Sequence, residues 1–212
     1  MKCIMQKKRT GILACLLLVS MNCWARSPVD AALDRDEQFL DALENMADGV
    51  ESGQLTGEWF FHELDRLHVK FAPDFVEVDL DTVTPQQKKR SRSLKNRKTE
   101  LEIRLYQLGF SPNPETGRYS IAYKILNLDA DSSMDILLDQ FEAFLNTVAS
   151  AMDLLSYRLI SEEEVVVLFN QMAENMERSY QDMAYADVTE KQLQRFQQLE
   201  QRVNQLEQQF NW

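Results

Sequence analysis

The stretch SSMDILLDQFEAFLNTVASAMDLL (residues 132–155) decides the fold of this chain. Its apolar residues recur every three or four positions, the spacing that places side chains on one face of an α-helix. That stripe comprises Met134, Leu137, Leu138, Phe141, Leu145, Val148, Met152 and Leu155. Short polar side chains at 131–133 provide capping groups for the first turn. We therefore predict a long amphipathic helix here.

Two further helices are predicted after it. Ser161 with Glu164, and Thr189 with Gln192, have the spacing of a capping box before an apolar stripe. The last stripe follows a 3, 4, 3, 4 spacing and comprises Phe196, Leu199, Val203, Leu206 and Phe210. Since the connections are short, residues 127–212 are predicted to form an antiparallel three-helix unit. The last helix would bury its stripe inside this unit or, alternatively, in a homo-oligomer.

The region 26–126 contains three more helix starts. Each combines a capping hydroxyl with a following apolar stripe, and two of them have proline at the first helical position. These starts are Ser27-Pro28, Thr56 and Thr84-Pro85. The predicted fold class is therefore mainly α, a helical bundle. The alternatives are a small β element at 75–80, where apolar and acidic residues alternate, and a hairpin over 100–126. No period of repetition is evident along the chain.

Residues 1–25 have the three parts of a secretory signal peptide. Four basic residues precede an apolar run from Gly11 to Met21, and small residues, Cys23 and Ala25, stand at −3 and −1 of a cleavage site. The run is too short to span a bilayer, which needs about 20 residues. We expect a periplasmic or secreted protein without a transmembrane segment. A lipid anchor at Cys23 is the alternative.

The charge is strongly negative and unevenly distributed. The formal net charge of −11 becomes more negative without residues 1–25, which contain four bases and no acid. Such a balance argues against binding nucleic acid, which requires a cationic surface. Acids dominate residues 29–81, whereas 88–98 contain only bases among their charged residues. These bases are Lys88, Lys89, Arg90, Arg92, Lys95, Arg97 and Lys98.

The basic segment 88–98 is the candidate binding site. Its bases fall all round a helix and Leu94 is its single apolar residue, so it does not form a membrane-surface helix. One interpretation is a solvated segment that offsets the acidic region. The other is a docking site for an acidic protein or an anionic component of the cell envelope.

The sequence contains no motif that assigns a catalytic residue, a metal ligand or a cofactor. His62 and His68 are six residues apart, so they do not share a helix face as the histidines of a zinc-protease helix do. We expect an exported cell-envelope interaction protein, non-catalytic, with a binding, adaptor or chaperone-like role. The alternative is a hydrolase that acts on a cell-wall polymer through acidic residues.

The leader makes a direct prediction about mass. The native protein should begin at Arg26, because cleavage after Ala25 satisfies the small-residue rule. Intact-mass spectrometry of the protein from the periplasm or the medium checks this. A mass that includes residues 1–25, or a lipid adduct on Cys23, would contradict soluble export.

Overall fold

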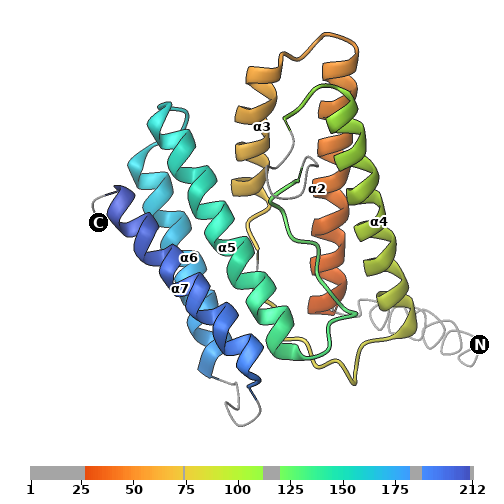
Figure 1. The fold of residues 1–212 in the computed structure, drawn as a ribbon, viewed down its shortest axis with the longest axis vertical. Coiled ribbons are helices and arrows are strands. Elements are labelled where there is room, and N and C mark those ends of the chain that lie inside the picture. The colour runs from red at the N-terminus through yellow and green to blue at the C-terminus, as the bar shows by residue number, and fades with distance from the viewer. Residues whose placement is uncertain (1–26, 74, 112–119, 182–187, 211–212) are drawn as a thin grey trace, which may run out of the picture.

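The computed structural model describes residues 27–73, 75–111, 120–181 and 188–210. Within these ranges the chain forms six helices and no strand, which confirms the helical bundle. The helices are α2 (Pro28–Glu51), α3 (Gly57–Lys70), α4 (Pro85–Gln107), α5 (Ser133–Ser156), α6 (Glu162–Gln181) and α7 (Glu190–Phe210). In Figure 1, α2, α4, α5 and α7 rise in the same direction, and α3 and α6 run the opposite way.

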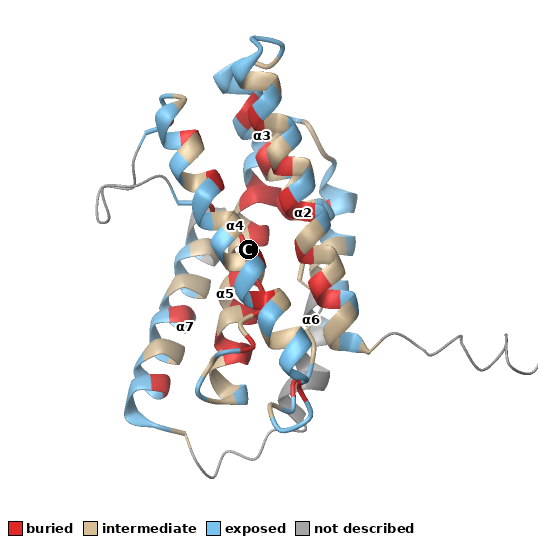
Figure 2. Cartoon of the chain, turned by 90° about the vertical axis from the view of Figure 1, so that its right-hand side faces the viewer, coloured by how far each residue is buried: buried red, intermediate tan, exposed pale blue. Residues whose placement is uncertain are grey.

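Two groups of three helices lie side by side. Helix α2 packs on α3 and α4, and α5 packs on α6 and α7. Among the described helices, the pair that joins the two groups is α3 with α5. Buried residues follow the facing sides of the helices in Figure 2, as expected when each amphipathic helix turns one stripe inward.

Both β alternatives are wrong for the described residues. Residues 75–79 have no regular secondary structure. Instead, the Gln140 side-chain amide donates to the Val76 carbonyl (2.9 Å) and accepts from the Val76 N–H (3.0 Å). Residues 100–107 belong to α4, and residues 120–127 have no regular secondary structure. The remainder of the proposed hairpin, 112–119, lies outside the described residues.

The structure corrects the statement that the chain lacks a repeat. Helices α2, α3 and α4 begin at residues 28, 57 and 85, and α5, α6 and α7 begin 105 residues later, at 133, 162 and 190. Their capping residues obey the same offset: Ser27, Thr56 and Thr84 recur as Ser132, Ser161 and Thr189. The described chain therefore contains two copies of one three-helix unit, a first repeat (27–107) and a second repeat (132–210).

Residue identities concentrate where the outer helices of each repeat meet. Ser27, Asp30, Leu33, Asp34, Glu37, Phe39 and Leu40 recur as Ser132, Asp135, Leu138, Asp139, Glu142, Phe144 and Leu145. Val83, Thr84, Gln87, Arg90, Leu94, Arg97 and Leu101 recur as Val188, Thr189, Gln192, Arg195, Leu199, Arg202 and Leu206. Equivalent contacts recur as well. Gln87 donates to Ser27 (3.2 Å), and Gln192 donates to Ser132 (2.8 Å).

The last helix is packed within its own chain. Leu199 is buried against Leu138, Phe141 and Leu145 of α5, and Phe196, Val203 and Leu206 pack around this cluster. The part of the α7 stripe from Phe196 to Leu206 therefore packs against α5.

A matched pair of turn residues provides a test of the duplication. Gly53 and Arg158, 105 residues apart, both have positive φ, 72° and 57°. A residue with a Cβ pays a conformational penalty there, which glycine does not. A Cβ added at Gly53 would meet nothing within 4 Å, so the penalty at this turn is purely conformational.

We predict that Arg158→Gly raises the free energy of unfolding by about 0.5–1 kcal/mol and that Gly53→Ala lowers it by about 1 kcal/mol. Urea denaturation of both variants checks this. Equal effects of the same sign would show that the two turns are not equivalent.

Candidate functional site

The basic segment belongs to α4, and three arginines of this helix form a ladder with the acidic helix α2. Arg97 contacts Asp41 and Glu44 at 2.6 and 2.5 Å. Arg90, seven residues earlier, contacts Asp34 and Glu37, and Arg104, seven residues later, contacts Asp48 and Glu51. A seven-residue step returns to nearly the same side of a helix, so the rungs stack along two parallel helices.

The ladder holds each guanidinium beside two carboxylates. This arrangement raises the pKa of all three guanidinium groups. For Arg97 and Arg104 the main cause is the hydrogen bonds to the acids. For Arg90 the largest effect is burial, which lowers the pKa, and the contacts with Glu37 and Asp34 outweigh it. The second repeat keeps a shorter version, in which Arg195 contacts Asp139 (2.6 Å) and Glu142 (2.9 Å). These charges therefore align helices within each repeat.

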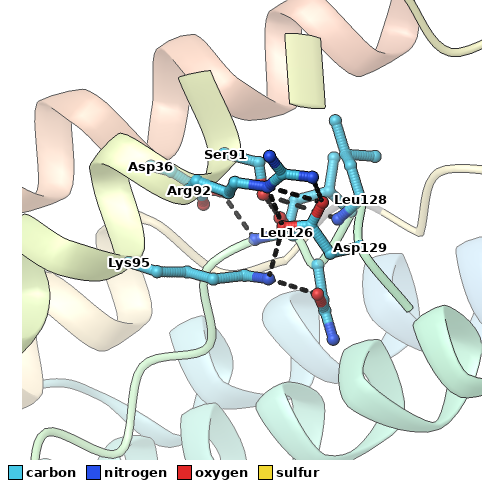
Figure 3. A network of polar contacts seen from close by, with 8 residues as sticks. Asp36, Ser91, Arg92, Lys95, Leu126, Leu128 and Asp129 are labelled. Atoms are coloured by element: carbon cyan, nitrogen blue, oxygen red, sulfur yellow. Dashed lines mark hydrogen bonds and ion pairs between the residues drawn. The ribbon is translucent and has the colours of Figure 1, made fainter. Parts of the chain in front are cut away.

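A second set of α4 residues binds the linker between the repeats, residues 120–131. Figure 3 shows Ser91, Arg92 and Lys95 gathered around it. The Ser91 hydroxyl donates to the Leu126 carbonyl (2.6 Å), and Arg92 Nε donates to both oxygens of Asp129 (2.9 and 3.0 Å). Lys95 contacts Asn127 and lies 3.7 Å from Asp129. Hydrogen bonding to Arg92 holds the pKa of Asp129 below its ordinary value.

The remaining bases differ in their surroundings. Lys98 lies 3.3 Å from Glu102, and burial lowers the pKa of its ammonium group. Lys88 and Lys89 form no ion pair with a described residue. Binding of an external partner by the segment remains a prediction, and within the segment these two lysines are the cations without an ion-pair partner among the described residues.

The buried carboxylate of Asp36, on α2, also binds the linker. It is 1% exposed and accepts hydrogen bonds from the Tyr123 hydroxyl (2.9 Å) and the Leu126 N–H (2.8 Å). Burial raises the pKa of Asp36, although the Leu126 N–H and nearby arginines favour its ionised form. A buried backbone segment outside a helix or strand needs hydrogen-bond partners from other parts of the chain, because its own N–H and C=O groups do not pair with one another.

Serine, histidine and aspartate also meet between the repeats, but not as a catalytic triad. His68 Nδ1 lies 2.9 Å from Ser150 Oγ, and burial raises the pKa of Asp65, three residues earlier on α3. In a triad the acid would orient the histidine, and the serine would be open to substrate. Here both His68 and Ser150 are buried. The cluster therefore serves packing between α3 and α5.

An open groove of about 1130 Å³ lies between the repeats. Its walls come from residues 76–79 of the first repeat, the linker, and the starts of α5 and α7. Apolar lining residues include Val76, Val78 and Met134. Six carboxylates and two bases also line it: Glu77, Asp79, Asp129, Asp131, Asp135, Asp139, Lys191 and Arg195. The groove is an acidic surface to which both repeats contribute.

The described residues contain neither a cluster that could hold a metal ion nor a helix that could cross a membrane. Among the described residues, no set of three or more histidine, cysteine or acidic side chains is arranged to hold a metal ion. Nor does any described helix have the length and apolarity needed to cross a membrane. No protein-family model, curated protein or solved structure was found to match this chain.

Sequence reasoning found the basic segment but missed its partners. The seven-residue spacing of Arg90, Arg97 and Arg104 against acids with the same spacing on residues 34–51 was the available signal. The roles of Asp36 and Ser91 could not be predicted from the sequence, because their hydrogen-bond partners lie in the linker, 90 and 35 residues away.

The ladder predicts a measurable loss on charge removal. Arg97→Gln should lower the free energy of unfolding by about 1 kcal/mol, because two acids would face each other without their cation. Lys89→Gln is the matched control on the same helix and should change stability by less than about 0.5 kcal/mol. Urea denaturation at low and high salt checks this, and the Arg97→Gln effect should shrink at high salt. Equal effects of the two variants would contradict the ladder.

Proposed function

We propose that this chain is an exported, non-catalytic interaction protein of the cell envelope. The observation that carries the proposal is the groove to which both repeats contribute, because tandem helical units build binding surfaces from neighbouring copies. The signal-peptide pattern of residues 1–25 supports export.

The size and lining of the groove favour a macromolecular partner. Pockets for small molecules enclose roughly 300–1,000 Å³ and are mostly apolar, whereas this groove is about 1130 Å³ and open and has six carboxylates on its walls. A segment of a protein with basic and apolar side chains suits such a surface, because opposite charge steers association and apolar contact retains the partner.

The hydrolase alternative receives no comparable support. A general acid needs a raised pKa. Among the described residues the carboxyl groups with a raised pKa are Asp36 and Asp65, and neither lines the groove. The acid Asp129 in the groove instead has a lowered pKa beside Arg92. We therefore propose binding and not hydrolysis.

Site-specific photocrosslinking in the native cells tests this function. A photoreactive residue at Lys191, in the groove, should give a discrete protein adduct in the exported fraction. The same residue at Glu100, exposed on α4 and away from the groove lining, is the matched control and should give none. Charge reversal by Glu77→Lys and Asp79→Lys should weaken the Lys191 adduct several-fold. Equal adducts at both positions, or retention of the chain in the cytoplasm, would contradict the proposal.

A further inference from the structure

The groove between the repeats contains carboxylates that the described chain does not neutralise. Asp129 is paired with Arg92 and lies within reach of Lys95. Asp139 is paired with Arg195. The four other acids of the lining form no ion pair with a described residue: Glu77, Asp79, Asp131 and Asp135. Their charges are therefore open to a cationic partner.

These four acids come in two pairs, one from each side of the groove, and each pair has an apolar neighbour. Glu77 and Asp79 belong to the segment 76–79 of the first repeat and lie next to the half-buried Val76. Asp131 ends the linker and Asp135 lies in the first turn of α5, next to the half-buried Met134. A partner that matches this lining carries two groups of cations along an apolar strip.

The backbone of the segment 76–79 is already engaged in hydrogen bonds. The N–H and the carbonyl of Val76 are both bonded to the Gln140 side chain (3.0 and 2.9 Å), and the Val78 carbonyl accepts from the Ser133 hydroxyl (2.8 Å). A peptide that binds as an added strand needs a row of unpaired backbone groups on its host, and these bonds interrupt such a row. A helix pairs its own backbone and binds through side chains. The wall therefore favours a helical partner.

Resting on the binding function above, we propose that the groove binds a basic amphipathic helix of a partner protein. The apolar stripe of this helix packs on Val76 and Met134, and its lysines or arginines lie beside the four unpaired acids. The groove volume of about 1130 Å³ corresponds to roughly ten helical residues, if a helix is taken as a cylinder about 10 Å wide. A methionine at the contact adapts to apolar side chains of different shape.

A second copy of this chain does not match the groove. The chain has a formal net charge of −11, so two copies repel each other. Its basic segment 88–98 does not provide a basic amphipathic helix, because Leu94 is buried and Arg90 and Arg97 are paired with acids of α2. The helix therefore comes from another protein.

Synthetic peptides test the class of partner. The probe is a fluorescein-labelled peptide of about 18 leucines and lysines, with leucine at spacings of three and four, long enough to form a helix. A second peptide of the same composition alternates the two residues and has the pattern of a strand. Fluorescence anisotropy with the mature chain at physiological salt should show that the helical peptide binds at least about tenfold more tightly.

Charge removal in the groove provides the second test. The double variant Glu77→Gln, Asp131→Asn removes one exposed acid from each pair, and neither side chain has a hydrogen bond or ion pair with a described residue. It should raise the Kd of the helical peptide about fivefold, as expected for the loss of two exposed ion pairs. Glu100→Gln, Glu200→Gln is the matched control. It removes the same charge from exposed positions outside the groove and should change the Kd by less than about twofold.

The helical partner is overturned if the two peptides bind equally, if the helical peptide does not bind, or if both double variants raise its Kd equally. A Lys191 adduct in cells together with any of these results would leave the binding function in place and remove only the helix. Should a variant lose its circular-dichroism helix signal, the wild-type chain decides the matter. Binding of the helical peptide should weaken at high salt, and binding that does not change with salt overturns the charge match.

Discussion

The packing of α3 against α5 is the contact on which the rest of the molecule depends. It connects two three-helix units that are otherwise organised around their own cores. The contact is not purely apolar, because the buried side chains of His68 and Ser150 meet within it. Buried polar groups stabilise only in the arrangement that satisfies them, so this cluster specifies how the repeats meet as well as holding them together.

In both repeats, ion pairs align the first helix with the third, α2 with α4 and α5 with α7. Arginines at a seven-residue spacing reach pairs of acids on the neighbouring helix, with three rungs between α2 and α4 and a shorter set between α5 and α7. Ion pairs at the surface are individually weak, so the ladder contributes register more than stability. The apolar positions beneath it, such as Leu94 and Leu199, supply the burial.

The repeats differ where the linker enters. In the first repeat Asp36 and Ser91 form hydrogen bonds with the linker backbone at Leu126. The equivalent positions in the second repeat are Phe141 and Phe196, whose rings lie 6.3 Å apart. The linker in the first repeat is not helical and requires hydrogen-bond partners for its backbone, which accounts for the polar side chains of Asp36 and Ser91. Phe141 and Phe196 belong instead to the apolar cluster between α5 and α7.

The sequence by itself determined the helices, because caps and apolar stripes are local: Ser27, Thr84 and Ser132 open helices where their spacing predicts. It also located the basic segment and the stripe of α7. Only the tertiary structure decided what those features contact. The arginine ladder, the contacts of α4 with the linker and the contact of His68 with Ser150 each connect residues more than 30 positions apart. The burial that shifts the pKa of His68 exists only once α2, α3 and α5 are assembled.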